Sequence, residues 1–181
     1  ADPAVRADSR VDLAVDAASG DPLGVALWDA PSSTDVVGPL GPGNEPPPGL
    51  DLDLLGGAWE LCLADAAQCE AHRPAEPHWY LYMVAVAPAA RGRGIGGQLL
   101  GHGLKRVDAE GLPAHLESTT PGSRRLYERF GFQQVAELAG SGLPVYWAMT
   151  RPARTGGPRG AESIGGPGDP TAPTGPVPTP R

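Results

Sequence analysis

Seven consecutive residues, Arg91-Gly92-Arg93-Gly94-Ile95-Gly96-Gly97, form a glycine-rich segment that also carries two arginines. The apolar run of residues 80–86 precedes it, and a helical pattern follows it as far as Glu110. Glycine allows the backbone to take a positive φ and to approach a ligand closely, and the first N–H groups of a helix point towards an anion. The segment therefore predicts a phosphate-binding turn between a strand and a helix.

A dinucleotide-binding turn is one interpretation of these residues. Gly92, Gly94 and Gly97 match the pattern G-x-G-x-x-G, and Glu117 lies about 20 residues further on, where that fold places a ribose-binding acid. In that fold, however, the first glycine follows the strand directly, whereas here residues 87–91 intervene. The chain after Glu117 is also too short to complete a doubly wound sheet, so the sequence disfavours this interpretation.

A second pattern, [Q/R]-x-x-G-x-[G/A], is met by Arg91, Gly94 and Gly96, and residues 126–132 read L-Y-E-R-F-G-F about thirty residues downstream. These two motifs, in this order and at this spacing, resemble the acetyl-CoA loop and the L-Y-E-x-x-G-F segment of the GNAT N-acetyltransferase superfamily. Residues 71–79 and 116–119 are similar to its puromycin N-acetyltransferase branch.

The resemblance implies a fold, a co-substrate and a set of binding residues. The fold is a layered α/β (α+β) domain, with a mixed and mostly antiparallel central sheet and helices on both faces. The co-substrate is acetyl-CoA, with no metal ion. The residues that would contact it are the strand end Val84, Ala85 and Val86, the loop Arg91, Gly92, Arg93, Gly94, Ile95, Gly96 and Gly97, and Ser123.

The chemistry of acetyl transfer to an amine points to two further residues. An alkyl amine with a pKa near ~10.4 is mostly protonated at neutral pH, so a base, or a water relayed to one, must take its proton. Glu117 is the expected base, and His115 shares its strand face and is the alternative. Tyr127 is the expected general acid, which would protonate the departing thiolate.

Two departures from the superfamily pattern bear on function. Relatives usually have a strand and two helices before the hairpin that begins here near Val11, so we interpret the domain as N-terminally incomplete. Relatives of the puromycin type also have Asn where this chain has Ser123. An enzyme that acetylates a small-molecule amine, conceivably a drug, is the first hypothesis. A catalytically idle module that binds coenzyme A or a protein partner is the alternative, and the sequence does not identify the acceptor.

The elements that must position these residues follow from periodicity and from turn signals. We expect one domain over residues 1–150 and a disordered, Pro- and Gly-rich tail over residues 151–181. Within the domain the patterns predict a hairpin of residues 11–16 and 23–29, an exposed loop at 31–49, an amphipathic helix at 50–70, a strand from 78 or 79 to 86, a helix at 96–110, a strand at 114–118, a helix at 120–129, and strands at 132–138 and 144–150.

Composition excludes several classes of function. The formal net charge of −7 argues against nucleic-acid binding, since such binding depends on Lys and Arg. The longest apolar run, residues 80–90, is about half of the ~20 residues that a membrane-spanning helix needs. We therefore expect no nucleic-acid or membrane partner and a cytoplasmic location. A homodimer is one hypothesis for the assembly, and the sequence does not determine the oligomeric state. Cys62 and Cys69 lie too far apart on one helix for a disulfide, so we expect two buried thiols.

Overall fold

The computed structural model describes residues 9–31, 49, 51–140 and 142–154 of the 181-residue chain. Most of the predicted loop at 31–49 and of the predicted tail lies outside these ranges. The described elements, in chain order, are β1 (Ser9–Val15), β2 (Pro22–Asp29), α1 (Leu52–Leu55), α2 (Ala58–Ala71), β3 (Trp79–Val86), the 3-10 helix η1 (Pro88–Ala90), α3 (Ile95–Glu110), β4 (Ala114–Ser118), α4 (Pro121–Arg129), β5 (Gln133–Leu138) and β6 (Tyr146–Arg151).

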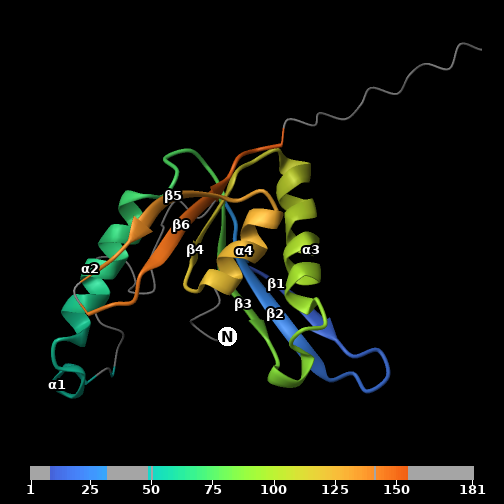
Figure 1. Ribbon diagram of the computed structural model, residues 1–181, viewed down its shortest axis with the longest axis horizontal. Helices are drawn as coiled ribbons and strands as arrows, with labels where there is room; N and C mark the ends of the chain where they lie inside the picture. Colours follow the sequence, from blue (N-terminus) through green and yellow to red (C-terminus); the bar gives the residue numbers. More distant parts are fainter. Residues whose placement is uncertain (1–8, 32–48, 50, 141, 155–181) are drawn as a thin grey trace, which may run out of the picture.

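The strands form one six-stranded sheet in the order β1-β2-β3-β4-β6-β5 (Figure 1). Every neighbouring pair is antiparallel except β3 and β4, which are parallel because α3 carries the chain back between them. This mixed, mostly antiparallel sheet with helices on its faces confirms the predicted fold class. The predicted strands and the helix after the glycine loop agree with the structure to within one or two residues, which is the usual uncertainty at element ends.

One face of the sheet packs against α3 and holds the main apolar core. Leu99, Leu100, Leu104 and Val107 recur along α3 at three- and four-residue spacing and are all buried against the sheet. These residues pack against side chains from the centres of β2, β3 and β4. One of those side chains, Trp28 of β2, is fully buried. Gly103 allows this approach, since a Cβ atom there would lie only 2.3 Å from the Trp28 indole nitrogen.

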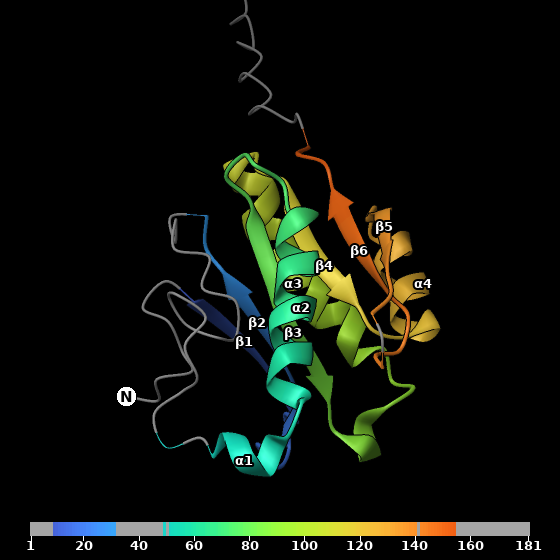
Figure 2. The same ribbon diagram turned by 90° about the vertical axis from the view of Figure 1, so that its left-hand side faces the viewer.

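The opposite face is covered by α2 (Figure 2). No residue of α2 is fully buried, and the helix contacts the sheet mainly through its half-buried side. The apolar cluster on this side is small and combines Leu138, Tyr146 and Ala148 with part of Cys69. The α2 face therefore leaves room for polar side chains between helix and sheet.

Two predictions about residues 50–70, the single helix and the burial of its thiols, are wrong. The structure has two helices, α1 and α2, separated at Gly56 and Gly57, because glycine is a poor helix former and two in succession interrupt the helix. The predicted pair of buried thiols is also wrong, since Cys62 is exposed and Cys69 is half-buried. Both cysteines are free thiols in the structure.

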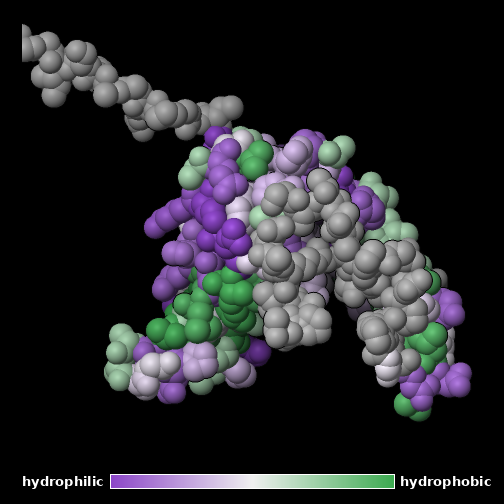
Figure 3. Space-filling model, turned by 180° about the vertical axis from the view of Figure 1, so that it is seen from behind, coloured by the Kyte–Doolittle hydropathy of each residue, from purple (hydrophilic) through white to green (hydrophobic). Residues whose placement is uncertain are grey.

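Arg151 and the edge strand β1 show two further features of the fold. Arg151, which the sequence places at the start of the tail, is the last residue of β6 and is buried. The edge strand β1 exposes Val11, Leu13 and Val15, each by about half, on the face opposite to α3, where apolar side chains gather in one patch (Figure 3). No helix in the described part of the chain is long and apolar enough to cross a bilayer.

Candidate active site

Strands β3 and β4 part shortly after they begin. Within the described residues, β4 pairs with β3 only at Trp79 and Tyr80, which lie opposite Ala114 and His115. The rest of β3, from Leu81 to Val86, continues along β2, and no strand of the described ranges pairs with its other side. The sheet therefore opens at Glu117, two residues beyond the last paired position of β4.

The strand register shows which backbone groups face this opening. Ala87 donates its N–H to the carbonyl of Leu23 at 2.9 Å. Because every second residue of a strand bonds to a given antiparallel neighbour, Ala85 is the next residue whose backbone groups face β2. The N–H and C=O groups of Val84 and Val86 therefore face away from β2, towards the opening. Of the three strand-end residues named from the sequence, Ala85 instead directs its main chain at β2.

The glycine-rich turn lies at the end of this strand. Gly92 and Gly94 have φ values of 75° and 78°, which non-glycine residues rarely adopt, and Gly94 is the N-cap of α3. A Cβ atom at either position would meet no other atom within 4 Å, so the backbone there is open to a ligand. The sixteen-residue helix that follows directs its first N–H groups at this turn.

Other residues of the turn have distinct positions. Arg91 and Arg93 are exposed, and the Arg93 guanidinium lies 4.0 Å from the Asp16 carboxylate in the β1–β2 turn. A pair so long and so exposed contributes little to stability, so both arginines are available to an anion. Ile95 is buried in the core, and only its backbone belongs to the turn. Gly96 and Gly97 face Leu126 and Phe130 of the neighbouring α4 segment across ordinary van der Waals distances.

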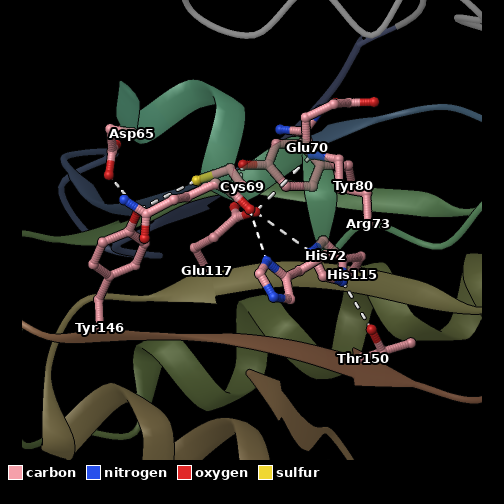
Figure 4. Close-up of polar contacts among 11 residues, drawn as sticks. Asp65, Cys69, Glu70, His72, Arg73, Tyr80, His115, Glu117, Tyr146 and Thr150 are labelled. Atoms are coloured by element: carbon pink, nitrogen blue, oxygen red, sulfur yellow. Dashed lines mark hydrogen bonds and ion pairs between the residues drawn. The ribbon is translucent and has the colours of Figure 1, made fainter. Parts of the chain in front are cut away.

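Glu117 is the centre of a buried polar cluster on the α2 face (Figure 4). Its Oε2 atom accepts a hydrogen bond from the Tyr80 hydroxyl at 2.5 Å. Its Oε1 atom lies 3.4 Å from His115 Nε2 and 4.0 Å from Arg73 Nε. The Arg73 guanidinium also stacks over the Tyr80 ring at 4.3 Å and approaches Glu70 at 3.4 Å. Three side chains, from β3, β4 and the segment after α2, thus converge on one carboxylate.

The surroundings keep this carboxylate ionised. Burial raises the pKa of the Glu117 carboxyl, but the polar contacts of His115 and Tyr80 and the charge of Arg73 outweigh burial and hold the pKa below its ordinary value. Burial and the Glu117 charge raise the pKa of the Tyr80 hydroxyl, so that it stays protonated and donates.

Two further groups extend the cluster along β6 and α2. His115 is fully buried, and its Nδ1 atom lies 2.8 Å from the Thr150 hydroxyl. The Tyr146 hydroxyl donates to Asp65 and lies 3.5 Å from the Cys69 sulfur. Burial raises the pKa of Cys69 to about 11, so this thiol is neutral at physiological pH.

The structure does not bring Tyr127 into this cluster. Tyr127 lies on α4, packs edge-on against Phe132 and belongs to the core on the α3 side of the sheet. Its hydroxyl makes no hydrogen bond to any residue in the described ranges, and burial raises its pKa. Glu117 and Tyr127 therefore lie on opposite faces of the sheet.

Ser123 has a structural role in α4. Its hydroxyl lies 2.8 Å from the Thr120 hydroxyl and 2.9 Å from that of Ser118, and Thr120 and Ser123 together form the capping box at the start of the helix. This arrangement fixes the start of α4 against the end of β4, and it leaves Ser123 little free capacity for a ligand.

Sequence reasoning gave no role to Arg73, Tyr80 or Thr150. The two-residue period of a strand placed His115 and Glu117 on one face, and the same period along β3 could have added Tyr80. No local signal could have added Thr150, because its contact with His115 depends on β6 pairing with β4.

A separate cavity of about 610 Å³ lies between α3, the end of α4 and the end of β6. Its wall includes the Arg151 guanidinium, which binds Asp108 through two hydrogen bonds of 2.7 and 3.0 Å. None of the site residues named from the sequence lines this cavity. In the described part of the chain, no group of three His, Cys, Asp or Glu side chains could hold a metal ion.

Comparison with known proteins agrees with the fold and the loop. The model of the acetyltransferase (GNAT) family matches residues 56–132, which include the glycine-rich turn, Glu117 and Tyr127. An uncharacterized N-acetyltransferase of Schizosaccharomyces pombe is 28% identical in an alignment of 131 residues that covers 62% of this chain and 48% of the relative. The chain thus spans about half the length of this relative.

Solved structures share the architecture. A histone acetyltransferase HPA2 and related acetyltransferase from Corynebacterium glutamicum is 27% identical with a TM-score of 0.54, over 81% of this chain and 66% of that one. The ribosomal-protein-S18-alanine N-acetyltransferase of Escherichia coli matches in fold, with 15% identity, a TM-score of 0.51, and 86% of this chain and 76% of that one covered. This chain is therefore similar to GNAT acetyltransferases over residues 56–132 and shares its fold with these two structures.

Proposed function

We propose that this protein is an N-acetyltransferase that moves the acetyl group of acetyl-CoA to the amine of a small molecule. The observation that carries the proposal is the opening of the sheet between β3 and β4, with the glycine-rich turn and the start of α3 directly after β3. The similarity of residues 71–79 and 116–119 to the puromycin N-acetyltransferase branch favours a small, drug-like acceptor.

The residues around the opening fit acetyl-CoA. Backbone groups of Val84 and Val86 face the opening and are suited to hydrogen-bond the amides of the pantetheine arm as a strand would. The backbone at Gly92 and Gly94 is open, and with the first N–H groups of α3 it is suited to the pyrophosphate. When bound, acetyl-CoA supplies an acetyl thioester as the activated group.

Glu117 is the proposed base. Its carboxylate is ionised at neutral pH and lies where the strands part, on the face of the sheet opposite to α3. It takes the proton of the acceptor ammonium, either directly or through one water, and the neutral amine then attacks the thioester carbonyl. Tyr80 and Arg73 hold the carboxylate in place through the hydroxyl contact and the guanidinium charge.

Tyr127 is the proposed general acid. Its raised pKa keeps the phenol protonated, and its hydroxyl is free of described partners, so the proton is available to a departing thiolate. In the balanced reaction the N–C bond forms and the C–S bond breaks. The amine loses a second proton, which replaces the one that Tyr127 has given to sulfur.

Two measurements test this function in sequence. Calorimetry with acetyl-CoA measures donor binding, and a thiol-release assay over a panel of primary amines, with the product identified by mass spectrometry, measures transfer. We expect saturable binding and amine-dependent release of coenzyme A. Absence of binding would contradict the assignment of the opening and the turn to acetyl-CoA. Binding without release on any amine would favour the alternative of an idle coenzyme A-binding module.

A further inference from the structure

Three buried polar atoms meet at Glu117 without a hydrogen-bond partner among the described residues. They are Glu117 Oε1, His115 Nε2 and Arg73 Nε. The His115 side chain is fully buried, and less than a tenth of the Glu117 and Arg73 side chains is exposed. Since a buried polar group without a partner destabilises the folded state, the position of the histidine proton matters at this point.

The other nitrogen of His115 limits where that proton is. Nδ1 lies 2.8 Å from the Thr150 hydroxyl, which is able either to donate or to accept a hydrogen bond. If Nδ1 carries the proton, Thr150 accepts, and the lone pair of Nε2 faces the lone pairs of Glu117 Oε1 at 3.4 Å. If Thr150 donates, the proton is on Nε2 and points at the carboxylate.

The second arrangement is the favourable one. It gives both ring nitrogens of His115 a partner of the correct kind, and it adds a charge-assisted N–H to a buried carboxylate. The first arrangement places two acceptors against one another where little water is present, and this is unfavourable in a medium of low dielectric.

We propose that Thr150 and His115 are positioning residues for Glu117: the Thr150 hydroxyl donates to Nδ1, and the N–H at Nε2 is thereby aimed at Oε1 and holds the carboxylate ionised at the opening of the sheet. The proposal deepens the function proposed above and rests on it for the role of Glu117 in catalysis. The arrangement of hydrogen bonds itself does not depend on that role.

Other charged and titratable groups also face this pair and act on it together. Tyr80 donates to the second carboxylate oxygen, Arg73 adds a positive charge, and His78 packs edge-on against the His115 ring at 6.0 Å. Burial lowers the pKa of His78, and Cys69 on α2 remains a neutral thiol, so neither adds a full charge at neutral pH. His115 is therefore the group whose proton position is set by a single neighbouring hydroxyl.

The first experiment reads the tautomer directly. Long-range ¹H–¹⁵N correlation spectra of the histidine rings in the full chain distinguish a proton on Nε2 from one on Nδ1. We expect His115 to carry it on Nε2 at neutral pH. A proton on Nδ1 alone would overturn the proposal, whether or not any variant folds.

The second experiment follows the Glu117 carboxyl by ¹³C NMR during an acid titration of the wild type and three variants. His115→Leu removes the N–H donor, so the carboxyl titration is expected to move up by about one pH unit, since a hydrogen bond to a charged group is lost. Thr150→Val should move it in the same direction by less, and Thr150→Ser, which keeps the hydroxyl, should leave it unchanged. An unchanged carboxyl titration in both His115→Leu and Thr150→Val would overturn the proposal.

Activity provides a third measurement. If Glu117 is the base, the acid limb of the kcat/KM profile should move with its titration in His115→Leu and Thr150→Val, while the KM for acetyl-CoA stays unchanged. An acid limb that does not move, although the carboxyl titration does, would contradict Glu117 as the base and leave the hydrogen-bond arrangement intact. The two failures are therefore distinguishable.

Discussion

The two faces of the central sheet differ in what they bury. On the α3 face, leucines, valines and aromatic side chains fill the space between helix and sheet, and Trp28 and Leu100 are completely buried. On the α2 face, the helix buries none of its residues fully, and a carboxylate, an imidazole and a guanidinium share the space with two tyrosines. Apolar burial stabilises the fold, whereas burial of charged groups costs free energy unless they are paired. We infer that the α3 face provides most of the stability and that the α2 face holds the proposed base, Glu117.

The largest expected effect concerns stability on the α3 face. In Gly103→Val the new Cβ would lie 2.3–2.8 Å from the Trp28 indole, and both residues are buried, so α3 must move away from the sheet. We expect the free energy of unfolding, measured by denaturant titration, to fall by about 3 kcal/mol, as for severe overpacking of a core.

Gly101→Ala is the matched control for this variant, because its Cβ would meet only the Phe130 ring edge at 3.3 Å. Its free energy of unfolding should change by less than about 1 kcal/mol, since the gain in helix propensity offsets the close contact. Equal stability of Gly103→Val and the wild type would contradict the assignment of the main core to this face.

The next effect concerns activity on the α2 face. Glu117→Gln keeps the shape and the acceptor for Tyr80 but removes the negative charge. We expect kcat/KM at neutral pH to fall about 100-fold, the lower end of what a general base contributes, with little change in acetyl-CoA affinity. Glu137→Gln, on β5 and bonded to Trp147, is the control and should retain activity. Full activity in Glu117→Gln would show that another group takes the proton.

A buried ion pair tests whether the α3 face also tolerates charge. Asp108→Asn removes the carboxylate that pairs with Arg151, a side chain only 4% exposed. We expect the free energy of unfolding to fall by about 2 kcal/mol, because hydrogen bonds to a charged group are weakened and the guanidinium stays buried. Arg154→Gln serves as control, since Arg154 is 74% exposed at 3.8 Å from the same carboxylate and should change stability by less than about 0.5 kcal/mol. If Asp108→Asn were as stable as the control Arg154→Gln, the pairing of Arg151 with Asp108 would not contribute to the stability of the fold.

Tyr127 is the proposed general acid, yet it lies on the α3 face, which otherwise provides stability. Tyr127→Phe keeps the ring that packs against Phe132 and removes the hydroxyl. We expect kcat to fall about tenfold, equivalent to ~1.4 kcal/mol, with the dissociation constant of acetyl-CoA and the melting temperature unchanged. A wild-type kcat in Tyr127→Phe would show that Tyr127 contributes only to core packing. The proposed acid–base catalysis would then involve residues of the α2 face alone.

Much of the fold was predictable from the sequence because local signals determined it. The turn residues between β1 and β2, the glycine after Glu110 and the Thr120–Ser123 cap each mark the end of an element. The helix at residues 50–70 was mispredicted because its apolar spacing continues through Gly56 and Gly57, whereas the backbone does not. The exposed Cys62 shows that periodicity identifies an apolar stripe but not how closely the sheet covers it.

Residues close together in the chain specify the strand, the glycine-rich turn and the helix that follow one another from Trp79 to Glu110, so these elements were predictable. The two-residue period of a strand also placed His115 and Glu117 on one strand face. The surroundings of that face depend on the tertiary fold, because Arg73, Tyr80 and Thr150 reach it from segments separated by up to 77 residues. Strand order and the parting of β3 from β4 bring them together, and both depend on pairings between distant segments that no local pattern specifies.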